Sequence, residues 1–411
     1  MILILTLLFI SVDTLRLTLD DALKIAKEKS PGQIEAILDS RTGRSKFIRS
    51  VTALLPRIQA TANYSVTSKP ITTRTWTGSI GLNQVVFSVD IFGNLIIGKN
   101  TFDYYQQKAK DATNNLVYNI KSGYFNLIKF YNLHTIAQAS LRRATESYNL
   151  MQEKFRLGQI SQIDLLRAEA FMTQAEIDLL TADKNLKVAN EDFKGQLGIE
   201  KDVLIKPVTE LTEPADFEYK DLESIWYEVL ENNPSLKVAR QTQKIAQLNL
   251  WRAIGQMLPE INYYLTNNYS DTVLPKSFRY WQEHDRTTFG FTFNFPILEL
   301  KSVIHNIYDA QLESQNASVR LKESTIALRK SITSAFLSFQ EAKERYNYAQ
   351  KNLKLNQQLY ELAKEQFRLG ALSILDLFDI ELKLGSAQTT YINALADTHT
   401  SKAWLDYLLG K

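Results

Sequence analysis

Hydrophobic and small residues recur with a seven-residue period along two long stretches of the chain. Counted backward from Phe367 in one stretch and from Phe155 in the other, these residues are separated alternately by four and three positions. Such a period predicts long helices that supercoil against their neighbours. A helix from about 97 to 155 would be roughly 85 Å long at ~1.5 Å per residue, which no compact core requires. The positions are Phe367, Ala363, Tyr360, Asn356, Leu353, Ala349, Tyr346 and Ala342, and Phe155, Met151, Tyr148, Ala144, Leu141, Ala137, His134 and Phe130.

The distribution of proline supports the same long helices. The 9 prolines lie at or before residue 70, between 207 and 275, or at 296, so that 71–206 and 297–411 contain none. Proline removes a backbone donor and clashes with the preceding helical turn, so uninterrupted helices need such proline-free spans.

Four short segments alternate with a period of two, which predicts β-strands at about 57–67, 75–87, 260–270 and 286–296. One face of each is apolar or aromatic and the other is small and uncharged, although Asn267 breaks the pattern. An ordinary half-buried sheet has the same period. The lack of Lys and Glu on the polar faces and the aromatic content favour a lipid-facing band around a water-filled interior. The residues expected to face lipid are Phe289, Phe291, Phe293, Phe295 and Trp76.

The number of strands has a consequence for assembly. Four strands cannot close a barrel around a water-filled lumen. Open strand edges in lipid would leave backbone groups unsatisfied at several kcal/mol each. Strands in a membrane must therefore pair with other copies of the chain, and three copies would supply twelve strands.

A repeated motif ends and restarts the predicted helices. Phe-Arg-Leu-Gly-x-x-Ser-x-x-Asp-Leu occurs at 155–165 and again at 367–377. Its glycine suits the left-handed residue that ends a helix, its arginine lies at the negative helix end, and its Ser-x-x-Asp resembles a capping box. The motif predicts a tight turn between two antiparallel helices in each half. The tip residues are Arg156, Leu157, Gly158 and Ser161, and Arg368, Leu369, Gly370 and Ser373.

The motif belongs to a longer internal duplication. Residues 148–198 align without a gap with 360–410, and 30–65 match 233–270 through Pro31/Pro234 and through a Leu-Pro pair in each half. A period this long indicates a duplicated unit and not a solenoid of short repeats. The predicted parts are a signal-like segment at 1–16, a first repeat at 17–198 with its hairpin at about 97–198, a linker at 199–220, and a second repeat at 221–411 with its hairpin at about 300–410.

Charge and composition narrow the range of functions. The net charge of +3 comes from 48 basic and 45 acidic residues without a block of one sign, so nothing indicates nucleic-acid binding. There is no cysteine, and the 4 histidines have no ligand spacing, so we expect no disulfide, no metal site and no cofactor. The apolar run from Ile2 to Ser11 suits the core of a signal peptide, with a buried strand as the alternative. No run approaches the 18 apolar residues of a membrane helix.

The ordered set of features resembles the TolC-like outer-membrane factor family over nearly the whole chain after about residue 16. The resemblance implies a mixed α and β fold, mainly α. In it a homotrimer forms a twelve-stranded outer-membrane β-barrel on a periplasmic α-helical barrel. It also implies a passive exit duct of a tripartite efflux pump or of type I secretion in a Gram-negative-type bacterium. The implied partners are outer-membrane lipid, a periplasmic adaptor and an inner-membrane transporter of the RND or ABC type, with the hairpin tips as docking sites.

The same resemblance implies an acidic gate at the periplasmic tip. The two aspartates of the second hairpin fall on Asp376 and Asp379, and the aspartate of the first hairpin falls on Asp164. The basic residue that latches the closed tip in one member of the family falls on Leu372, which is uncharged. A latch of that kind is therefore not expected here.

The sequence distinguishes Asp376 from Asp379, the two acids of the second hairpin. Asp376 and Asp164 are both explained as helix-capping acids. Asp379 is not needed for the cap, and its counterpart in the first half is Arg167. A solvated acid in the first helical turn, favoured by ~0.3–1 kcal/mol, is the alternative to a pore role. Because Asp379 shares a helix face with Asp376, a threefold axis would gather six carboxylates that attract cations. Asp379 is the better gate candidate.

Other classes of function fit the sequence less well. An enzyme lacks support, because there is no nucleophile–His–acid set, no phosphate-binding glycine loop and no HExxH motif. A soluble periplasmic coiled-coil scaffold or adaptor is the alternative, since the heptads alone would support it. The alternation of aromatic and uncharged residues in both halves favours the channel, because a scaffold has no use for it.

Overall fold

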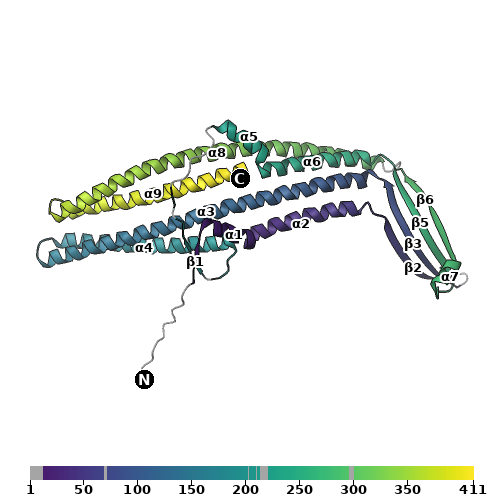
Figure 1. Cartoon of the computed structure of the whole chain (residues 1–411), viewed down its shortest axis with the longest axis horizontal. Helices are drawn as coiled ribbons and strands as arrows, with labels where there is room; N and C mark the ends of the chain where they lie inside the picture. The colour runs from purple at the N-terminus through teal and green to yellow at the C-terminus, as the bar shows by residue number, and fades with distance from the viewer. Residues whose placement is uncertain (1–12, 69–71, 202, 210, 213–220, 296–299) are drawn as a thin grey trace, which may run out of the picture. The chain divides into compact units, whose positions relative to one another are not determined.

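The computed structural model describes residues 13–68, 72–201, 203–209, 211–212, 221–295 and 300–411, and its main elements occur twice in the same order (Figure 1). The first series is α1 (Leu19–Lys29), α2 (Pro31–Thr52), β2 (Arg57–Thr67), β3 (Thr73–Phe87), α3 (Val89–Arg156) and α4 (Gln162–Leu197). The second series is α5 (Leu222–Asn232), α6 (Pro234–Gly255), β5 (Glu260–Asp271), α7 (Phe278–Glu283), β6 (Asp285–Asn294), α8 (Leu300–Arg368) and α9 (Ile374–Leu409). Two further strands are β1 (Asp13–Leu17) and β4 (Val203–Pro207).

Equivalent helices of the two series have nearly equal lengths. Helices α2 and α6 have 22 residues each, α4 and α9 have 36 each, and α3 and α8 have 68 and 69. The predicted fold class, a mainly helical duplicated unit of two strands and one long hairpin, is thereby confirmed. Helix α7 has no counterpart between β2 and β3 within the described residues.

The chain forms two compact units, and each draws on both halves of the sequence. The hairpin unit comprises Met1–Ala36, Lys110–Asn233 and Ala327–Lys411, and the sheet unit comprises Ile37–Ala109 and Pro234–Ile326. Helices α3 and α8 contribute residues to both units. The predicted signal-like segment 1–16 overlaps β1 from Asp13 onward, and its residues 1–12 lie outside the described part of the chain.

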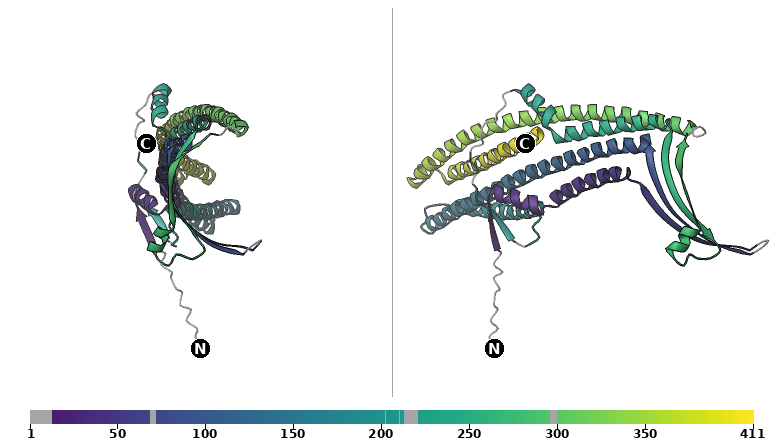
Figure 2. Two further views of the ribbon diagram at one scale, coloured as in Figure 1. Left: turned by 90° about the vertical axis from the view of Figure 1, so that its right-hand side faces the viewer. Right: turned by 45° about the vertical axis from the view of Figure 1, so that its right-hand side comes forward.

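Four antiparallel strands make up the sheet of the sheet unit, in the order β2-β3-β5-β6 (Figure 2). Side chains of directly paired residues project to the same face. The apolar face carries Ile58, Ala60, Ala62, Tyr64 and Val66 of β2, Trp76, Gly78, Ile80 and Leu82 of β3, Ile261, Tyr263 and Leu265 of β5, and Phe289, Phe291 and Phe293 of β6. The opposite face is polar and carries charged residues only near strand ends, at Arg57, Glu260 and Arg286.

One buried core of the hairpin unit forms where α1, β1 and β4 pack on α3 and α4. Strands β1 and β4 are parallel. The buried hydroxyl of Tyr124 on α3 donates to the carbonyl oxygen of Leu17 at 3.0 Å, and Asn190 Nδ2 on α4 donates to that of Ile205 at 2.9 Å. These bonds connect backbone groups of the short strands to the long helices.

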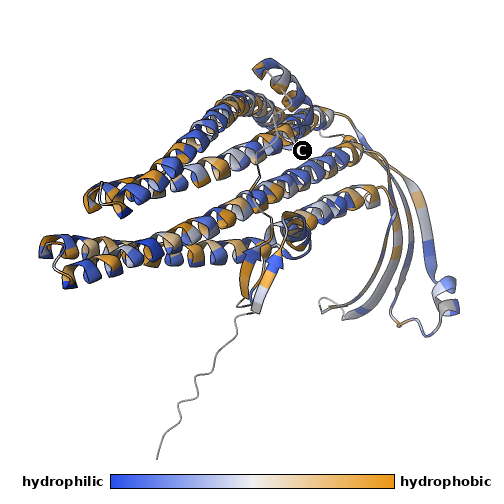
Figure 3. Ribbon diagram, turned by 60° about the vertical axis from the view of Figure 1, so that its left-hand side comes forward, coloured by the Kyte–Doolittle hydropathy of each residue, from blue (hydrophilic) through white to orange (hydrophobic). Residues whose placement is uncertain are grey.

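The seven-residue pattern describes how the long helices pack. In α8, the heptad residues Ala342, Tyr346, Ala349 and Ala363 are all at most 5% exposed. Hydrophobic and hydrophilic residues alternate along the whole length of the hairpins (Figure 3), as expected for helices with a narrow apolar stripe. The two halves differ at the tip, where Phe367 is half-buried and Phe155 is 41% exposed.

Candidate functional site

Each hairpin of the hairpin unit turns through a glycine with left-handed backbone geometry. Gly158 has φ +68° and Gly370 has φ +76°. The N–H of Gly158 donates to the carbonyl oxygen of Phe155 at 2.9 Å, and that of Gly370 to the carbonyl oxygen of Phe367 at 3.1 Å. The residue after each glycine donates to the carbonyl five positions before it, at 2.9 Å. This pair of bonds satisfies the last carbonyls of α3 and α8.

Replacing Gly370 by Ala is expected to destabilise the turn by about 1–2 kcal/mol, because an L side chain is strained at this φ. A Cβ at Gly370 would meet no atom within 4 Å, so the cost is one of backbone conformation alone. Gly385, within α9, also has open space around a Cβ but lies in regular helix. Gly385→Ala is therefore the matched control and should stabilise by roughly 0.5–1 kcal/mol. Thermal unfolding followed by circular dichroism would contradict this account if both variants shifted in the same direction.

A serine cap starts the second helix of each hairpin, as predicted. The N–H of Asp164 donates to Ser161 Oγ, and that of Asp376 to Ser373 Oγ, both at 3.2 Å. Each serine hydroxyl in turn donates to the Oδ2 atom of the same aspartate at 2.7 Å. The carboxylates thus support the cap through the hydroxyl, whereas a full capping box would bond the backbone N–H of the serine.

The arginines at the tips are paired with acids of the preceding helical turn. Arg156 Nη2 lies 3.1 Å from Glu153 Oε2, and Arg368 Nη2 lies 3.1 Å from Glu365 Oε2. The leucine that follows each arginine is strongly exposed, Leu157 by 62% and Leu369 by 73%. Each tip therefore presents an apolar side chain beside a neutralised ion pair. The docking role of these residues stays a prediction.

The three candidate gate acids have different surroundings. Asp376 is exposed and is held by its serine cap. Asp379 is also exposed, and its Oδ2 atom lies 2.6 Å from Lys383 Nζ. Asp164 Oδ1 lies 3.5 Å from Arg167 Nη1. Within one chain Asp379 therefore has a cationic partner that was not predicted, although the i+4 spacing of Lys383 is visible in the sequence.

A cluster of apolar side chains joins the two hairpins behind the tips. Phe171 of α4 stacks on Phe378 of α9, with ring centroids 4.2 Å apart and an interplanar angle of 11°. Met151 of α3 and Ala168 of α4 are buried in the same cluster as Ile374 of α9. The start of α9, which carries Asp376 and Asp379, is thereby packed against the first hairpin.

A buried ion pair that was not predicted from the sequence lies next to this cluster. Arg143 Nε of α3 lies 2.8 Å from Glu381 Oε1 of α9, and Glu381 is only 2% exposed. Burial raises the pKa of Glu381, and the hydrogen bond and charge of Arg143 oppose that rise. The Arg143 guanidinium also lies 5.8 Å from the ring centre of Tyr360. The sequence around Glu381 does not indicate its burial. Glu169 occupies the equivalent position of the first repeat and is exposed.

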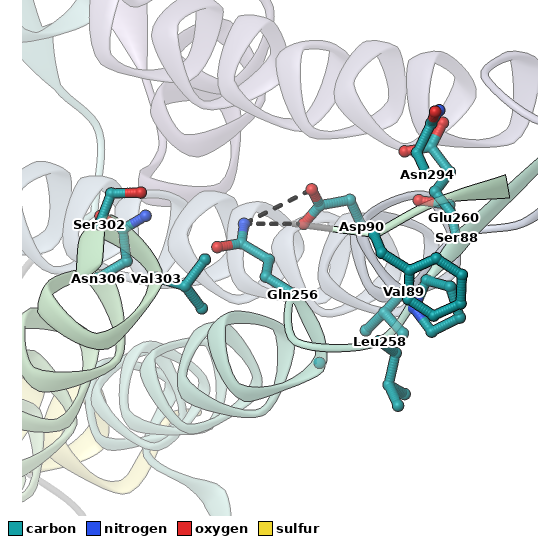
Figure 4. Close-up of a pocket in the computed structure, with 13 residues that line it drawn as sticks. Ser88, Val89, Asp90, Gln256, Leu258, Glu260, Asn294, Ser302, Val303 and Asn306 are labelled. Atoms are coloured by element: carbon teal, nitrogen blue, oxygen red, sulfur yellow. Dashed lines mark hydrogen bonds between the residues drawn. The ribbon is translucent and has the colours of Figure 1, made fainter. Parts of the chain in front are cut away.

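A polar pocket lies in the sheet unit, where β-strands adjoin helices (Figure 4). It has a volume of about 840 Å³ and includes Ser88, Asp90, Gln256, Glu260 and Asn306 in its lining. Gln256 Nε2 donates to the two carboxylate oxygens of Asp90 at 3.2 and 3.5 Å. Glu260 accepts from a neighbouring asparagine amide. Amide groups therefore bind both acids of the pocket.

Phe289, Phe291 and Phe293 lie on one face of β6 and Phe295 follows that strand, while the lipid contact of these residues and of Trp76 stays a prediction. Phe289, Phe291, Phe293 and Phe295 are 59–71% exposed in the single chain. Trp76 is half-buried because it contacts Tyr64 on the paired strand, with ring centroids 4.6 Å apart. Among the described residues, no helix is both long and apolar enough to cross a membrane.

A family model described as outer membrane efflux protein matches residues 36–198 and 225–411. The chain belongs to the outer membrane efflux protein family. The matched ranges include both hairpins and all four strands of the sheet. The family resemblance drawn from the sequence is thereby confirmed, and so is the outer membrane as the location of this class of protein.

Relatives and solved structures agree with this membership. The chain is 18% identical over 291 residues to nodulation protein T of Rhizobium leguminosarum bv. trifolii, covering 71% of this chain and 62% of that protein. It is 20% identical over 392 residues to outer membrane protein TolC of Escherichia coli, covering 90% and 77%. The structure of the CmeC outer membrane channel of Campylobacter jejuni matches with a TM-score of 0.86 at 16% identity, covering 95% and 85%. These likenesses show that the fold is that of outer membrane channels.

Proposed function

We propose that the chain is one subunit of a homotrimeric exit duct in the outer membrane. In this assembly the β6 edge of one copy pairs with the β2 edge of the next, and three sheets close a twelve-stranded barrel. The long helices of the three copies form the periplasmic tunnel below it. The duct is passive, since energy for transport comes from its partners.

The two faces of the sheet are the observation that carries this proposal. One face is apolar, and its phenylalanines are exposed in the single chain, while the other is polar and uncharged between the strand ends. This is the pattern of a barrel with lipid outside and water inside. Strands β2 and β6 each have one edge without a partner in the described sheet. In lipid these edges require neighbouring copies, because unsatisfied backbone groups cost several kcal/mol each.

The proposed partners are a periplasmic adaptor and an inner-membrane transporter of the RND or ABC type. Relatives include a probable efflux pump outer membrane protein, TtgC of Pseudomonas putida, and the alkaline protease secretion protein AprF of Pseudomonas aeruginosa. The names of these relatives thus cover both efflux and the secretion of a protease. The exposed leucines at the two hairpin tips are the surface that we assign to docking.

Cross-linking tests the docking proposal directly, because the chain has no cysteine of its own. Leu369→Cys, labelled through its thiol with a photoactivatable cross-linker, is expected to cross-link to the adaptor on illumination, because Leu369 is 73% exposed. Leu180 is similarly exposed, at 71%, but lies within α4 away from the turn motif, so Leu180→Cys is the matched control. Equal cross-linking from both positions would show that the tip is not the docking surface.

The alternative function, a soluble periplasmic coiled-coil scaffold or adaptor, is less well supported. It leaves the apolar sheet face without a role, and it does not fit a family of outer membrane proteins. Fractionation distinguishes the two, because a scaffold would be recovered without detergent. Recovery with the outer membrane and channel conductance of the purified protein in planar bilayers are the results expected of the duct.

We further propose that Asp376 and Asp379 form the acidic constriction of the tunnel entrance. Replacing both by Ala is expected to raise single-channel conductance about twofold or more and to weaken block by multivalent cations, since carboxylates at a constriction bind cations. Lys383→Gln is the matched control with the opposite sign. It removes the cation 2.6 Å from Asp379 and should strengthen the block. Unchanged conductance and block in the double variant would refute the gate.

A further inference from the structure

A polar patch interrupts the apolar face of the sheet near the β5–β6 connection. Asn267 lies on this face of β5, between Leu265 and Tyr269. On β6, Asp285 and Thr287 lie on the same face, directly opposite Tyr269 and Asn267. Asn267 Nδ2 donates to Thr287 Oγ1 at 3.1 Å and also to Asp285 Oδ2. A bare patch of this kind could not face hydrocarbon without a large penalty.

Helix α7 covers the patch. Trp281 Nε1 donates to Asn267 Oδ1 at 2.6 Å. The Trp281 ring stacks on Tyr269 with centroids 5.1 Å apart and an interplanar angle of 21°, and Tyr269 is only 2% exposed. A Cβ on Gly78 would lie 2.3 Å from the Trp281 ring, so the indole occupies the space above this glycine. Gly78 also lies on the apolar face, which places α7 on that side of the sheet.

On β5 and β6 the character of the apolar face changes at this level, whereas β3 and β2 keep apolar side chains there, including Ile80 and Tyr64. From Leu265 and Phe289 toward the helices, the face of these two strands is apolar, with the phenylalanines of β6 exposed and the β5 side chains half-buried. The strand from Phe289 to Phe295 accounts for about 20 Å of that surface at ~3.3 Å per residue, close to the ~25 Å apolar band of outer-membrane barrels. Beyond the patch lie Asp271, whose carboxylate accepts from the Tyr280 hydroxyl at 2.9 Å, and the strongly exposed Arg279. Apolar, covered polar and charged groups thus follow one another along β5 and β6.

We propose that α7 is an interfacial anchor that contacts membrane lipid, with Trp281 at the boundary between headgroups and acyl chains of the leaflet farther from the long helices. Tryptophan favours this boundary because its ring is apolar while its N–H needs a polar partner, here Asn267. The helix seals the patch from lipid and presents Arg279, Gln282 and His284 to the headgroup layer. This inference rests on the proposed function, since it requires the apolar face of the sheet to face lipid.

Depth-dependent fluorescence quenching tests the anchor. The chain has 5 tryptophans. The reporter protein keeps Trp281 and has Phe at Trp76, Trp226, Trp251 and Trp404. It is reconstituted in phosphatidylcholine vesicles whose acyl chains are brominated either near the headgroup or near the bilayer centre. Shallow bromines should quench Trp281 at least about twofold more than deep ones, because interfacial tryptophan lies at headgroup level. If the reporter protein fails to assemble, the difference in fluorescence between the unaltered chain and Trp281→Phe gives the same quantity.

A second reporter separates failure of the anchor from failure of the proposed function. It carries Phe291→Trp in a chain with all five original tryptophans replaced by Phe, and deep bromines should quench it more than shallow ones. Quenching of the Phe291→Trp reporter without any quenching of Trp281 would overturn the anchor and place α7 in the lumen or in water, while the lipid-facing sheet would stand. Absence of quenching in both reporters would overturn the orientation of the sheet itself, and the anchor with it.

Two glycine substitutions further test how α7 packs on the sheet. Gly78→Ala should displace the Trp281 ring, increase its quenching by an aqueous quencher and shift its emission to the red. Gly81→Ala is the matched control, because its Cβ would project to the opposite face and make only ordinary contact, 3.5 Å from Thr266. Equal emission from both variants would contradict the packing on which the anchor depends.

Discussion

Replacing Phe291 by Arg is expected to abolish the heat-resistant oligomer and its recovery with the outer membrane. Phe291 is 59% exposed and lies in the middle of the apolar rows of β6, beside Tyr263 of β5. An arginine facing lipid near the midplane of a barrel costs about 2–4 kcal/mol, and a trimer would bear this cost three times. The measurement is electrophoresis of outer-membrane fractions in SDS with and without heating.

The adjacent residue provides the control. Thr292 is also exposed, but its side chain projects to the polar face, opposite Asn262. Thr292→Arg should therefore assemble normally, because a charge on the lumen side stays in water. Normal heat-resistant oligomer from Phe291→Arg, or equal loss from both variants, would count against a barrel with this orientation.

Removing the cation of the buried ion pair is expected to have the second large effect. Arg143→Leu leaves Glu381 as an uncompensated acid that is 2% exposed. Removing one partner of a buried pair costs about 3–5 kcal/mol, and the partial exposure of Arg143 reduces this to roughly 2–4 kcal/mol. The midpoint of thermal unfolding should fall by roughly 2–5 °C at neutral pH, because the unfolding entropy of a 411-residue chain is large. Lys383→Leu, which breaks an exposed pair on the same helix, should change it little.

The loss of folding stability in Arg143→Leu should depend on pH. The pKa of Glu381 is raised in the folded chain, mainly by burial, and Arg143 limits the rise. Without Arg143 the folded pKa rises further. The folded state then binds a proton more tightly than the unfolded state, so the contribution of Glu381 to stability is fully present below its unfolded pKa and is lost as pH rises through its folded pKa. Acidification toward the unfolded pKa should therefore recover part of the stability of Arg143→Leu.

A double variant tests whether the pair itself is favourable. Arg143 Nη2 is buried and donates to no protein partner among the described residues, so the polar site is incompletely satisfied. Replacing such a pair by apolar residues of similar size is often neutral or stabilising. Arg143→Leu with Glu381→Leu should thus unfold near the temperature of the unaltered chain. A loss equal to the sum of the single losses would mean that the two residues do not act through each other.

The hairpin turns could be predicted from sequence because their causes are local. A glycine at +68° or +76°, a serine cap and an acid three residues later each act within one turn of helix. The sheet faces were predictable for a similar reason, since strand alternation fixes the face of every side chain once the register is set. These signals required no knowledge of distant contacts.

Contacts between distant segments could not be predicted in this way. Glu381 and Glu169 occupy equivalent positions of the repeat, yet one is buried against Arg143 and the other is exposed. The position equivalent to Arg143 is Leu355, which is uncharged and 55% exposed, so the second hairpin offers Glu169 no comparable partner within the chain. Asn267, an interruption of the strand pattern in the sequence, is explained only by Trp281 from the following helix.

The duplication has a consequence for symmetry that reaches beyond the single chain. Helices α4 and α9 have equal length and begin with the same cap, so a threefold assembly would display six hairpins of nearly equal shape. Their charges are not equal, because Arg167 of α4 stands where α9 has Asp379. A partner protein that recognises only the shape of the tips would find six equivalent binding positions. One that recognises their charge would find three. The same ring of tips can therefore impose two different stoichiometries on the proteins that bind it.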